Sequence, residues 1–194
     1  MSELKALDVY LCGVGGQGIG TLSEVLLRAC LEAGYEVFGA DTHGLAQRGG
    51  IVRSQMRLGR KRYCPLIPPG GADLVIALER LEGLRATVGM LKPGGTVVCF
   101  DTTQQPMSVR SGAFEYPGVE TLEKAVAAKG GTLELVTSDD LPDPRMQNTA
   151  LLARIAQAGA IPGVTAEILE KELAGVLKPA DLEKNLEVFR GAAV

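Results

Sequence analysis

Apolar and polar positions along the chain predict strands and helices in alternation. The apolar run Leu7–Cys12 contains one charged residue and predicts a buried first strand. Apolar residues at helical spacing then predict a helix from Ile19 to Ala33. Further strands are expected at Glu36–Ala40, Ile51–Leu58, Arg62–Cys64, Leu74–Leu78, Thr96–Phe100 and Leu133–Val136. Further helices are expected up to Met90 and at Val119–Lys129, Asn148–Ala158, Ala166–Leu177 and Ala180–Phe189.

This alternation predicts an α/β fold, a three-layer α/β/α sandwich with a Rossmann-like mixed sheet. Polar and apolar residues alternate in Ile51–Leu58, and a turn at Gly59 leads into Arg62–Cys64, so these two segments are expected to form one antiparallel hairpin. The segment Leu91–Gly95 reads as a turn. Since we find neither an internal repeat nor a long linker, residues 1–194 are expected to form a single domain.

A glycine-rich loop joins the first strand to the first helix. Gly13, Gly15, Gly16 and Gly18 lie where a backbone must turn sharply, and glycine allows positive φ and close approach of a ligand. The first turn of the helix offers free N–H groups and the positive end of its dipole. The loop is therefore a candidate phosphate or cofactor site, to which Gln17 could offer its amide. Glycines that merely let the helix pack closely on the strand are the alternative.

Charge is unevenly distributed along the chain. The net charge is −3, yet no Asp or Glu occurs between Thr42 and Ala72, where six residues are basic. This basic segment predicts an anionic ligand or an acidic partner surface, whereas the acidic remainder would repel nucleic acid. Arg53 and Arg57 fall on one strand face with no acidic neighbour in sequence, so we assign them to a ligand or partner interface.

The cysteine pattern and the apolar runs exclude several classes of protein. The chain has four cysteines, which are far apart in sequence and form no C-x-x-C pair: Cys12, Cys30, Cys64 and Cys99. This pattern predicts buried free thiols. It also predicts a colourless, iron-free chain with no metal site of its own. No apolar run approaches the ~20 residues of a membrane span, and the N-terminus has no signal-peptide core. We therefore expect a cytoplasmic protein with no membrane contact.

Two motifs together resemble a known family. The loop at Gly13–Gly18, and the stretch H-G-L-A-Q-R-G-G from His43 to Gly50 followed by a basic strand, are similar to the gamma-type subunit or domain of 2-oxoacid:ferredoxin oxidoreductases, particularly its indolepyruvate branch. Asn148 and the ending Glu183–Gly191 also fit, although the chain after Phe100 resembles the family only loosely.

The resemblance implies an accessory subunit in the oxidative decarboxylation of arylpyruvates or other 2-oxoacids to acyl-CoA. Thiamine diphosphate and iron–sulfur clusters would reside on a larger alpha-type catalytic subunit, coenzyme A would be a co-substrate, and electrons would reach ferredoxin through the complex. No cofactor is expected on this chain alone. His43, Gln47 and Arg48 would join Arg53 and Arg57 at the ligand or partner interface. The single histidine has no nucleophile or orienting partner nearby in sequence, so no catalytic residue is assigned.

Three other interpretations stay open at this point. A dinucleotide-binding protein would use Asp41, at the end of the second strand, to hold a ribose hydroxyl. A methyltransferase would place its motifs at Asp73–Ala77 and Leu91–Gly95. A scaffold would pack its glycine loop against a partner and bind nothing. The basic hairpin in place of a crossover helix argues against the first two.

Overall fold

The computed structural model describes residues 5–42, 50–59, 63–105, 109, 111–112, 115–137 and 141–192. Within these ranges, no helix combines the length and the apolar character that a membrane crossing requires.

A six-stranded sheet forms the middle of the protein, with the strands in the order β2-β3-β1-β4-β5-β6. β3 runs antiparallel to both of its neighbours, β1 and β2, whereas β1, β4, β5 and β6 run parallel to one another. The sheet is therefore mixed, as expected. The strands are β1 (Leu7–Val14), β2 (Val37–Thr42), β3 (Ile51–Leu58), β4 (Ala72–Ala77), β5 (Leu91–Phe100) and β6 (Thr132–Val136).

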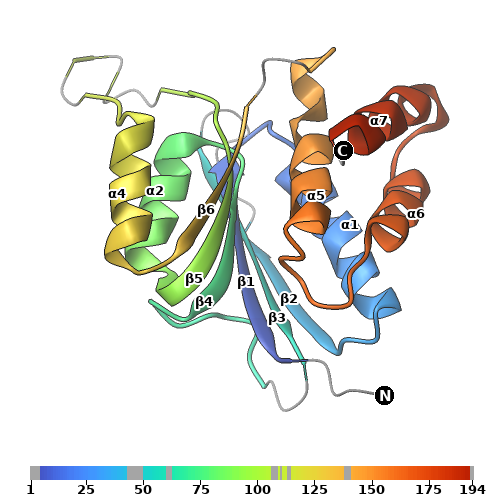
Figure 1. The fold of residues 1–194 in the computed structure, drawn as a ribbon, viewed down its shortest axis with the longest axis horizontal. Helices are drawn as coiled ribbons and strands as arrows, with labels where there is room; N and C mark the ends of the chain where they lie inside the picture. Colours follow the sequence, from blue (N-terminus) through green and yellow to red (C-terminus); the bar gives the residue numbers. More distant parts are fainter. Residues whose placement is uncertain are drawn as a thin grey trace.

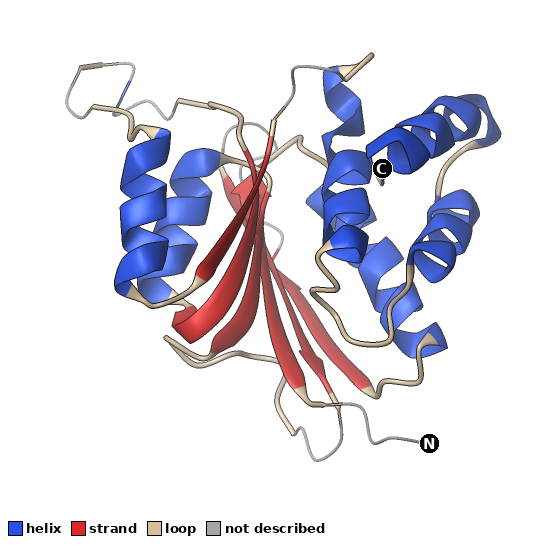
Figure 2. Ribbon diagram, viewed as in Figure 1, coloured by secondary structure: helices blue, strands red, loops and turns tan. Residues whose placement is uncertain are grey.

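Helices cover both faces of the sheet, which confirms the three-layer sandwich (Figure 1). One face is covered by α2 (Arg80–Gly89) and α4 (Val119–Ala128). The other face carries α1, α5, α6 and α7, and Figure 2 shows the sheet between the two helical layers. Their bounds are Ile19–Glu32 for α1, Gln147–Gln157 for α5, Ala166–Val176 for α6 and Pro179–Ala192 for α7, with a 3₁₀ turn η1 (Pro144–Met146) before α5.

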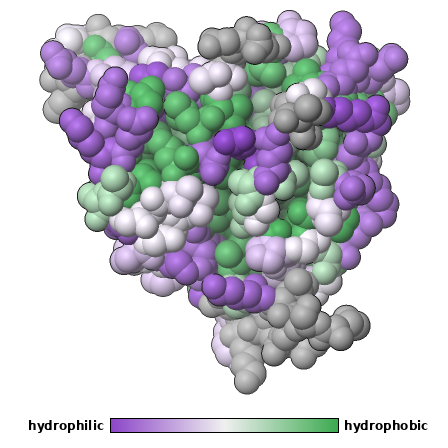
Figure 3. All heavy atoms as spheres, in the orientation of Figure 1, coloured by the Kyte–Doolittle hydropathy of each residue, from purple (hydrophilic) through white to green (hydrophobic). Residues whose placement is uncertain are grey.

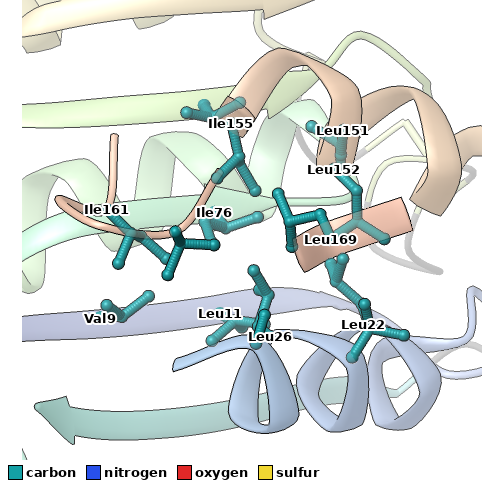
Figure 4. Packing of buried hydrophobic residues seen from close by; sticks show 14 of the residues in the cluster. Val9, Leu11, Leu22, Leu26, Ile76, Leu151, Leu152, Ile155, Ile161 and Leu169 are labelled. Carbon is teal, nitrogen blue, oxygen red and sulfur yellow. The ribbon is translucent and has the colours of Figure 1, made fainter. Parts of the chain in front are cut away.

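Alternation along β1 divides the buried core into two parts. Val9 and Leu11 belong to the cluster under α1, α5 and α6, and Tyr10 and Cys12 belong to the cluster under α2 and α4. Successive side chains of a strand point to opposite faces, so one buried strand serves both layers. Figure 4 shows the larger cluster, in which β1, β4, α1, α5 and α6 supply Leu11, Ile76, Leu22, Leu26, Leu151, Leu152 and Leu169.

The edge strand β6 shows the same alternation at a partly exposed position. Leu133 and Leu135 are half-buried and pack into the cluster under α4. Figure 3 shows apolar surface in this region, between α4 and β6. On the opposite face of β6, Glu134 forms an ion pair of 2.6 Å with Arg154 of α5. The strand is thus held by apolar contacts on one side and by a charged contact on the other.

Two sequence-based expectations about strands are wrong. β3 forms its antiparallel hairpin with β2, not with Arg62–Cys64, because Val37–Thr42 pairs along its whole length. Tyr63 and Cys64 lie outside any strand, and Arg62 lies outside the described residues. The expected turn at Leu91–Gly95 is instead the first half of β5, where the pairing register with β4 shifts and Gly94 adopts a φ of 74°.

Candidate functional site

Three positions of the glycine loop require glycine: two because their backbone has a positive φ, and a third because a neighbouring side chain lies too close for a Cβ atom. Gly16 has a φ of 102°, and Gly18, the N-cap of α1, has a φ of 78°; both lie in the left-handed region that other residues rarely adopt. At Gly13, an added Cβ atom would lie 2.9 Å from the Cβ of Leu78. Gly15 donates its N–H to the carbonyl of Gly50 at 2.8 Å, which ties the loop to the start of β3.

Gln17 braces this loop from the inside. Its side chain is buried, the Oε1 atom accepts the Val14 N–H at 2.7 Å, and the Nε2 atom donates to the Leu78 carbonyl at 2.7 Å. These bonds tie the loop to the end of β4. The side-chain amide therefore holds the turn in shape, and only the second lone pair and the second N–H of the amide are left for another contact.

The start of α5, which is distant in sequence, contacts the glycine loop. The Asn148 Nδ2 atom donates to the carbonyl of Gly18 at 3.0 Å, and the Gln147 Nε2 atom donates to the carbonyl of Gln17 at 3.2 Å. The Oδ1 atom of Asn148 is buried and has no hydrogen-bond partner among the described residues. The start of α5 is thereby fixed against the start of α1.

These two segments border a groove of 480 Å³. Its walls come from α1, from the loop after β5, from η1 and the start of α5, and from α6 and α7. No side chain caps α1, and its first turn contains no acidic residue, so uncapped N–H groups remain at the end of the helix that borders the groove. Apolar side chains line the inner part: Leu22, Val25, Leu152, Leu173 and Leu177. The volume lies in the range of small-molecule sites.

An arginine and an aspartate lie where η1 enters the groove. Asp143 caps η1 by accepting the Arg145 N–H at 2.9 Å, and the Arg145 guanidinium donates to both carboxylate oxygens. These bonds lower the pKa of Asp143 to about 2. The Arg145 side chain is 88% exposed, so its remaining N–H groups face solvent at the groove. Sequence reasoning missed this pair, although Asp143 before Pro144 is a typical start signal for a helix.

A buried carboxyl group supports the other wall of the groove. Glu79 follows β4, is 1% exposed, and accepts hydrogen bonds from the backbone of Glu82 and Gln104 and from the hydroxyl of Tyr116. Burial raises the pKa of Glu79 above its ordinary value, although these hydrogen bonds oppose the shift. Because Gln104 lines the groove, Glu79 positions that wall. No motif in the sequence pointed to it.

The site therefore lies between β1 and β4, where the chain turns to opposite faces of the sheet. The connection after β1 forms α1 on one face, and the connection after β4 forms α2 on the other. Open α/β sheets bind ligands in the crevice at this point, outside the carboxyl ends of the strands.

Comparison with known proteins decides the family. The model of the family described as pyruvate ferredoxin/flavodoxin oxidoreductase matches residues 8–193. The chain belongs to this family. Two relatives carry the name indolepyruvate oxidoreductase subunit IorB. The one from Archaeoglobus fulgidus is 44% identical over 60% of this chain and 57% of its own length, and the one from Thermococcus kodakarensis is 29% identical over 96% and 94%.

Solved structures of this oxidoreductase family share the fold. The gamma subunit of a keto/oxoacid ferredoxin oxidoreductase from Geobacter sulfurreducens superposes with a TM-score of 0.61, at 18% identity over 96% of both chains. A 2-oxoglutarate:ferredoxin oxidoreductase from Magnetococcus marinus, with 2-oxoglutarate, coenzyme A and succinyl-CoA bound, gives a TM-score of 0.66 at 21% identity. This chain corresponds to 31% of that longer chain.

The two arginines of β3 lie on the face of the sheet opposite the groove. Arg53 and Arg57 share one face of β3, as expected, but that face is the one on which α2 lies. Arg57 is paired with a carboxylate that lies far away in sequence: its Nε and Nη2 atoms donate to both oxygens of Asp8, each at 3.1 Å. No acidic residue lies near Arg57 in sequence, as stated above, but the pairing of β1 with β3 brings Asp8 to it. Arg53 is exposed and lines a second cavity.

The remaining residues singled out from the sequence have mixed outcomes. His43, Gln47 and Arg48 lie outside the described residues. Asp41 accepts hydrogen bonds from Ser54 and Ser23. Three cysteines are buried as expected, but Cys64 is exposed. The dinucleotide and methyltransferase alternatives are not favoured, because the family match covers nearly the whole chain and antiparallel β3 separates β2 from β1.

Proposed function

We propose that this chain is the accessory subunit of an indolepyruvate or related 2-oxoacid:ferredoxin oxidoreductase. The complex would decarboxylate a 2-oxoacid oxidatively to an acyl-CoA and pass the electrons to ferredoxin. Family membership over residues 8–193 and the names of the relatives support this reaction class. In this proposal, residues 1–194 form one gamma-type domain that works in the cytoplasm.

A larger alpha-type subunit would carry the thiamine diphosphate and the iron–sulfur clusters. Within the described ranges, no three His, Cys, Asp or Glu side chains are grouped so that they could hold a metal ion. Cys12, Cys30 and Cys99 are buried, and burial raises the pKa of the Cys30 thiol to about 12, which disfavours the thiolate that a cluster needs. The Magnetococcus chain, about three times as long as the region matched here, is consistent with further domains on a partner.

The groove at the glycine loop is the observation that carries a role in coenzyme A use. When bound, coenzyme A supplies the thiol that accepts the acyl group. The N–H groups at the start of α1 and the exposed Arg145 guanidinium would bind its phosphates. Apart from Gly16 itself and its two chain neighbours, no residue has an atom within 4 Å of a Cβ added at Gly16, so the space in front of the loop is open. The apolar side chains that line the groove, which include Leu22 and Leu177, would contact the pantetheine arm.

Reconstitution tests the proposed function. Each chain is assayed alone and together with the co-purifying large subunit for arylpyruvate-dependent reduction of a viologen dye. We expect turnover from the mixture only. Full activity of the large chain alone, or turnover by this chain alone, would contradict the accessory role.

A pair of arginine variants tests the groove within the reconstituted complex. Arg145→Ala should raise the KM for coenzyme A about tenfold, the value of one lost charge-assisted contact, and leave the KM for the oxoacid unchanged. Arg190→Ala is the matched control, because this arginine is also an exposed, ion-paired residue but lies away from the groove. Equal effects of the two substitutions would place coenzyme A elsewhere.

A further inference from the structure

A second cavity, of 360 Å³, lies on the other face of the sheet from the groove. It runs along α2, between that helix and the strands β1 and β3, and it shares no lining residue with the groove. The polar side chains in its wall are Tyr10, Arg53, Glu82 and Arg85. Apolar surface is provided by Cys12 and Met90, among others. The glycine loop and the proposed coenzyme A contacts are not part of it.

Two hydrogen-bond donors in this cavity have no protein partner. Arg53 is exposed and forms neither a hydrogen bond nor an ion pair with any residue that the structure describes. Tyr10 as a whole is 5% exposed, but its hydroxyl oxygen is not one of the fully buried atoms, and no hydrogen bond of this group is found among the described residues. The Tyr10 hydroxyl therefore reaches the surface of the cavity, where it can donate a hydrogen bond to a ligand. Burial raises the pKa of Tyr10, which keeps this hydroxyl protonated as a donor at neutral pH.

The charges of the described residues around the cavity favour a ligand with a single negative charge. Glu82 is 5% exposed and forms an ion pair of 2.5 Å with Arg85, so these two residues neutralise each other. Among the described residues that line the cavity, Arg53 is then the cation without a partner. A dianion such as phosphate would carry a second charge toward the Glu82 carboxylate, and the described lining offers no further cation to balance it. The apolar wall of Cys12, Ala86 and Met90 suits a carbon skeleton.

We infer that this cavity binds a small monocarboxylic acid with an apolar body. The guanidinium of Arg53 and the hydroxyl of Tyr10 donate to the carboxylate, and the apolar body packs along α2 against Ala86 and Met90. An arginine fork and a phenol supply the donor geometry that a carboxylate requires. The inference is independent of the proposed function, because the cavity and the groove lie on opposite faces of the sheet.

Titration of the full chain with phenylacetate tests the inference, with isothermal calorimetry for affinity and amide NMR shifts for location. We expect millimolar or tighter binding, with shifts at α2 and at Tyr10. Phenylacetamide, which is nearly isosteric but neutral, should bind at least about tenfold more weakly, since it lacks the charge-assisted bond. Inorganic phosphate should not displace phenylacetate. Displacement by phosphate, equal affinity for the amide, or no binding at millimolar concentration would each overturn the inference.

Variants locate the carboxylate within the cavity. Arg53→Ala should weaken phenylacetate binding about tenfold, and Tyr10→Phe, which keeps the buried ring, should weaken it about fivefold. Arg28→Ala on α1 is the matched control, because it removes an exposed arginine from the opposite face. Arg145→Ala in the groove should also leave the affinity unchanged. Unaltered binding by Arg53→Ala would refute the site even if reconstitution shows the proposed oxidoreductase activity.

Discussion

The replacement Gln17→Glu should destabilise the protein at neutral pH and lose most of this effect on acidification. The Gln17 amide accepts from Val14 and donates to the carbonyl of Leu78, both at 2.7 Å, at a position only 6% exposed. A carboxylate can replace the acceptor but not the donor, so one of its oxygens would face the Leu78 carbonyl oxygen. A protonated carboxyl group has both functions and restores both bonds.

The size of the effect follows from burial and from this pair of bonds. Facing a carbonyl at a buried site should raise the pKa of the introduced carboxyl group by roughly two units above its ordinary ~4.3. At ~1.4 kcal/mol for each unit, the ionised form lowers the free energy of unfolding by about 3 kcal/mol. Since the pKa is raised in the folded state, the full loss holds above the raised value. It disappears as the pH falls towards ~4.3, where the carboxyl group is protonated in both states.

Urea unfolding of the variant and of the unaltered chain, compared at the same pH, measures this difference. At pH ~7.5 the variant should be less stable by about 3 kcal/mol, and at pH ~5 by about 1 kcal/mol. Gln157→Glu, at an exposed position of α5, should change stability by less than ~0.5 kcal/mol at both values. If Gln17→Glu lost no more stability than this control, or if its loss did not shrink on acidification, the two hydrogen bonds of the Gln17 side chain would not stabilise the loop as described.

Three further comparisons, each measured by urea unfolding, test other parts of the structure. Gly18→Ala should lower the free energy of unfolding more than Gly16→Ala. Both positions have a positive φ, which costs an alanine ~1–2 kcal/mol, but only the Cβ atom added at Gly18 would also lie 2.6 Å from a side-chain nitrogen, that of Asn148. Equal losses in the two variants would contradict this packing. Arg57→Ala should cost about 1–3 kcal/mol by breaking a partly buried ion pair, whereas Arg53→Ala should stay within ~0.5 kcal/mol, and the reverse order would be inconsistent with their contacts. Burial raises the pKa of Glu79, so ionisation of this side chain opposes folding. As the pH falls from the raised pKa to ~4.5, the unaltered chain should therefore gain stability relative to Glu79→Gln. A stability difference that does not change with pH would exclude the raised pKa.

Local patterns in the sequence predicted most elements of the fold. The alternation in Ile51–Leu58 gave both the bounds of β3 and its polar face, because side chains on a strand alternate regardless of what the strand pairs with. The choice of partner could not be predicted in this way. A short turn near Gly59 favoured Arg62–Cys64, yet pairing depends on whole-sheet register, and β3 lies between β1 and β2.

The candidate site was only half predictable, because its two sides come from distant parts of the chain. The glycine loop is a local motif, and its bend is encoded by Gly16 and Gly18. Its opposite side depends on contacts such as that of Asn148 with Gly18, which are 130 residues apart. Glu79 is similarly invisible in sequence, because a lone glutamate after a strand reads as an ordinary helix cap until its burial is known.

The antiparallel strand β3 determines what kind of ligand the glycine loop can suit. In a dinucleotide-binding sheet, the acid after the second strand lies one strand away from the loop and reaches a ribose hydroxyl. Here β3 occupies that place, so β2 and Asp41 lie two strands from β1, about 9.5 Å at the usual strand spacing. Asp41 is also engaged by Ser23 and Ser54. The loop keeps its N–H groups, no ribose-binding acid lies beside it among the described residues, and its second side comes from α5. This arrangement favours a phosphate-bearing coenzyme held between α1 and α5 over a nicotinamide dinucleotide laid across the sheet.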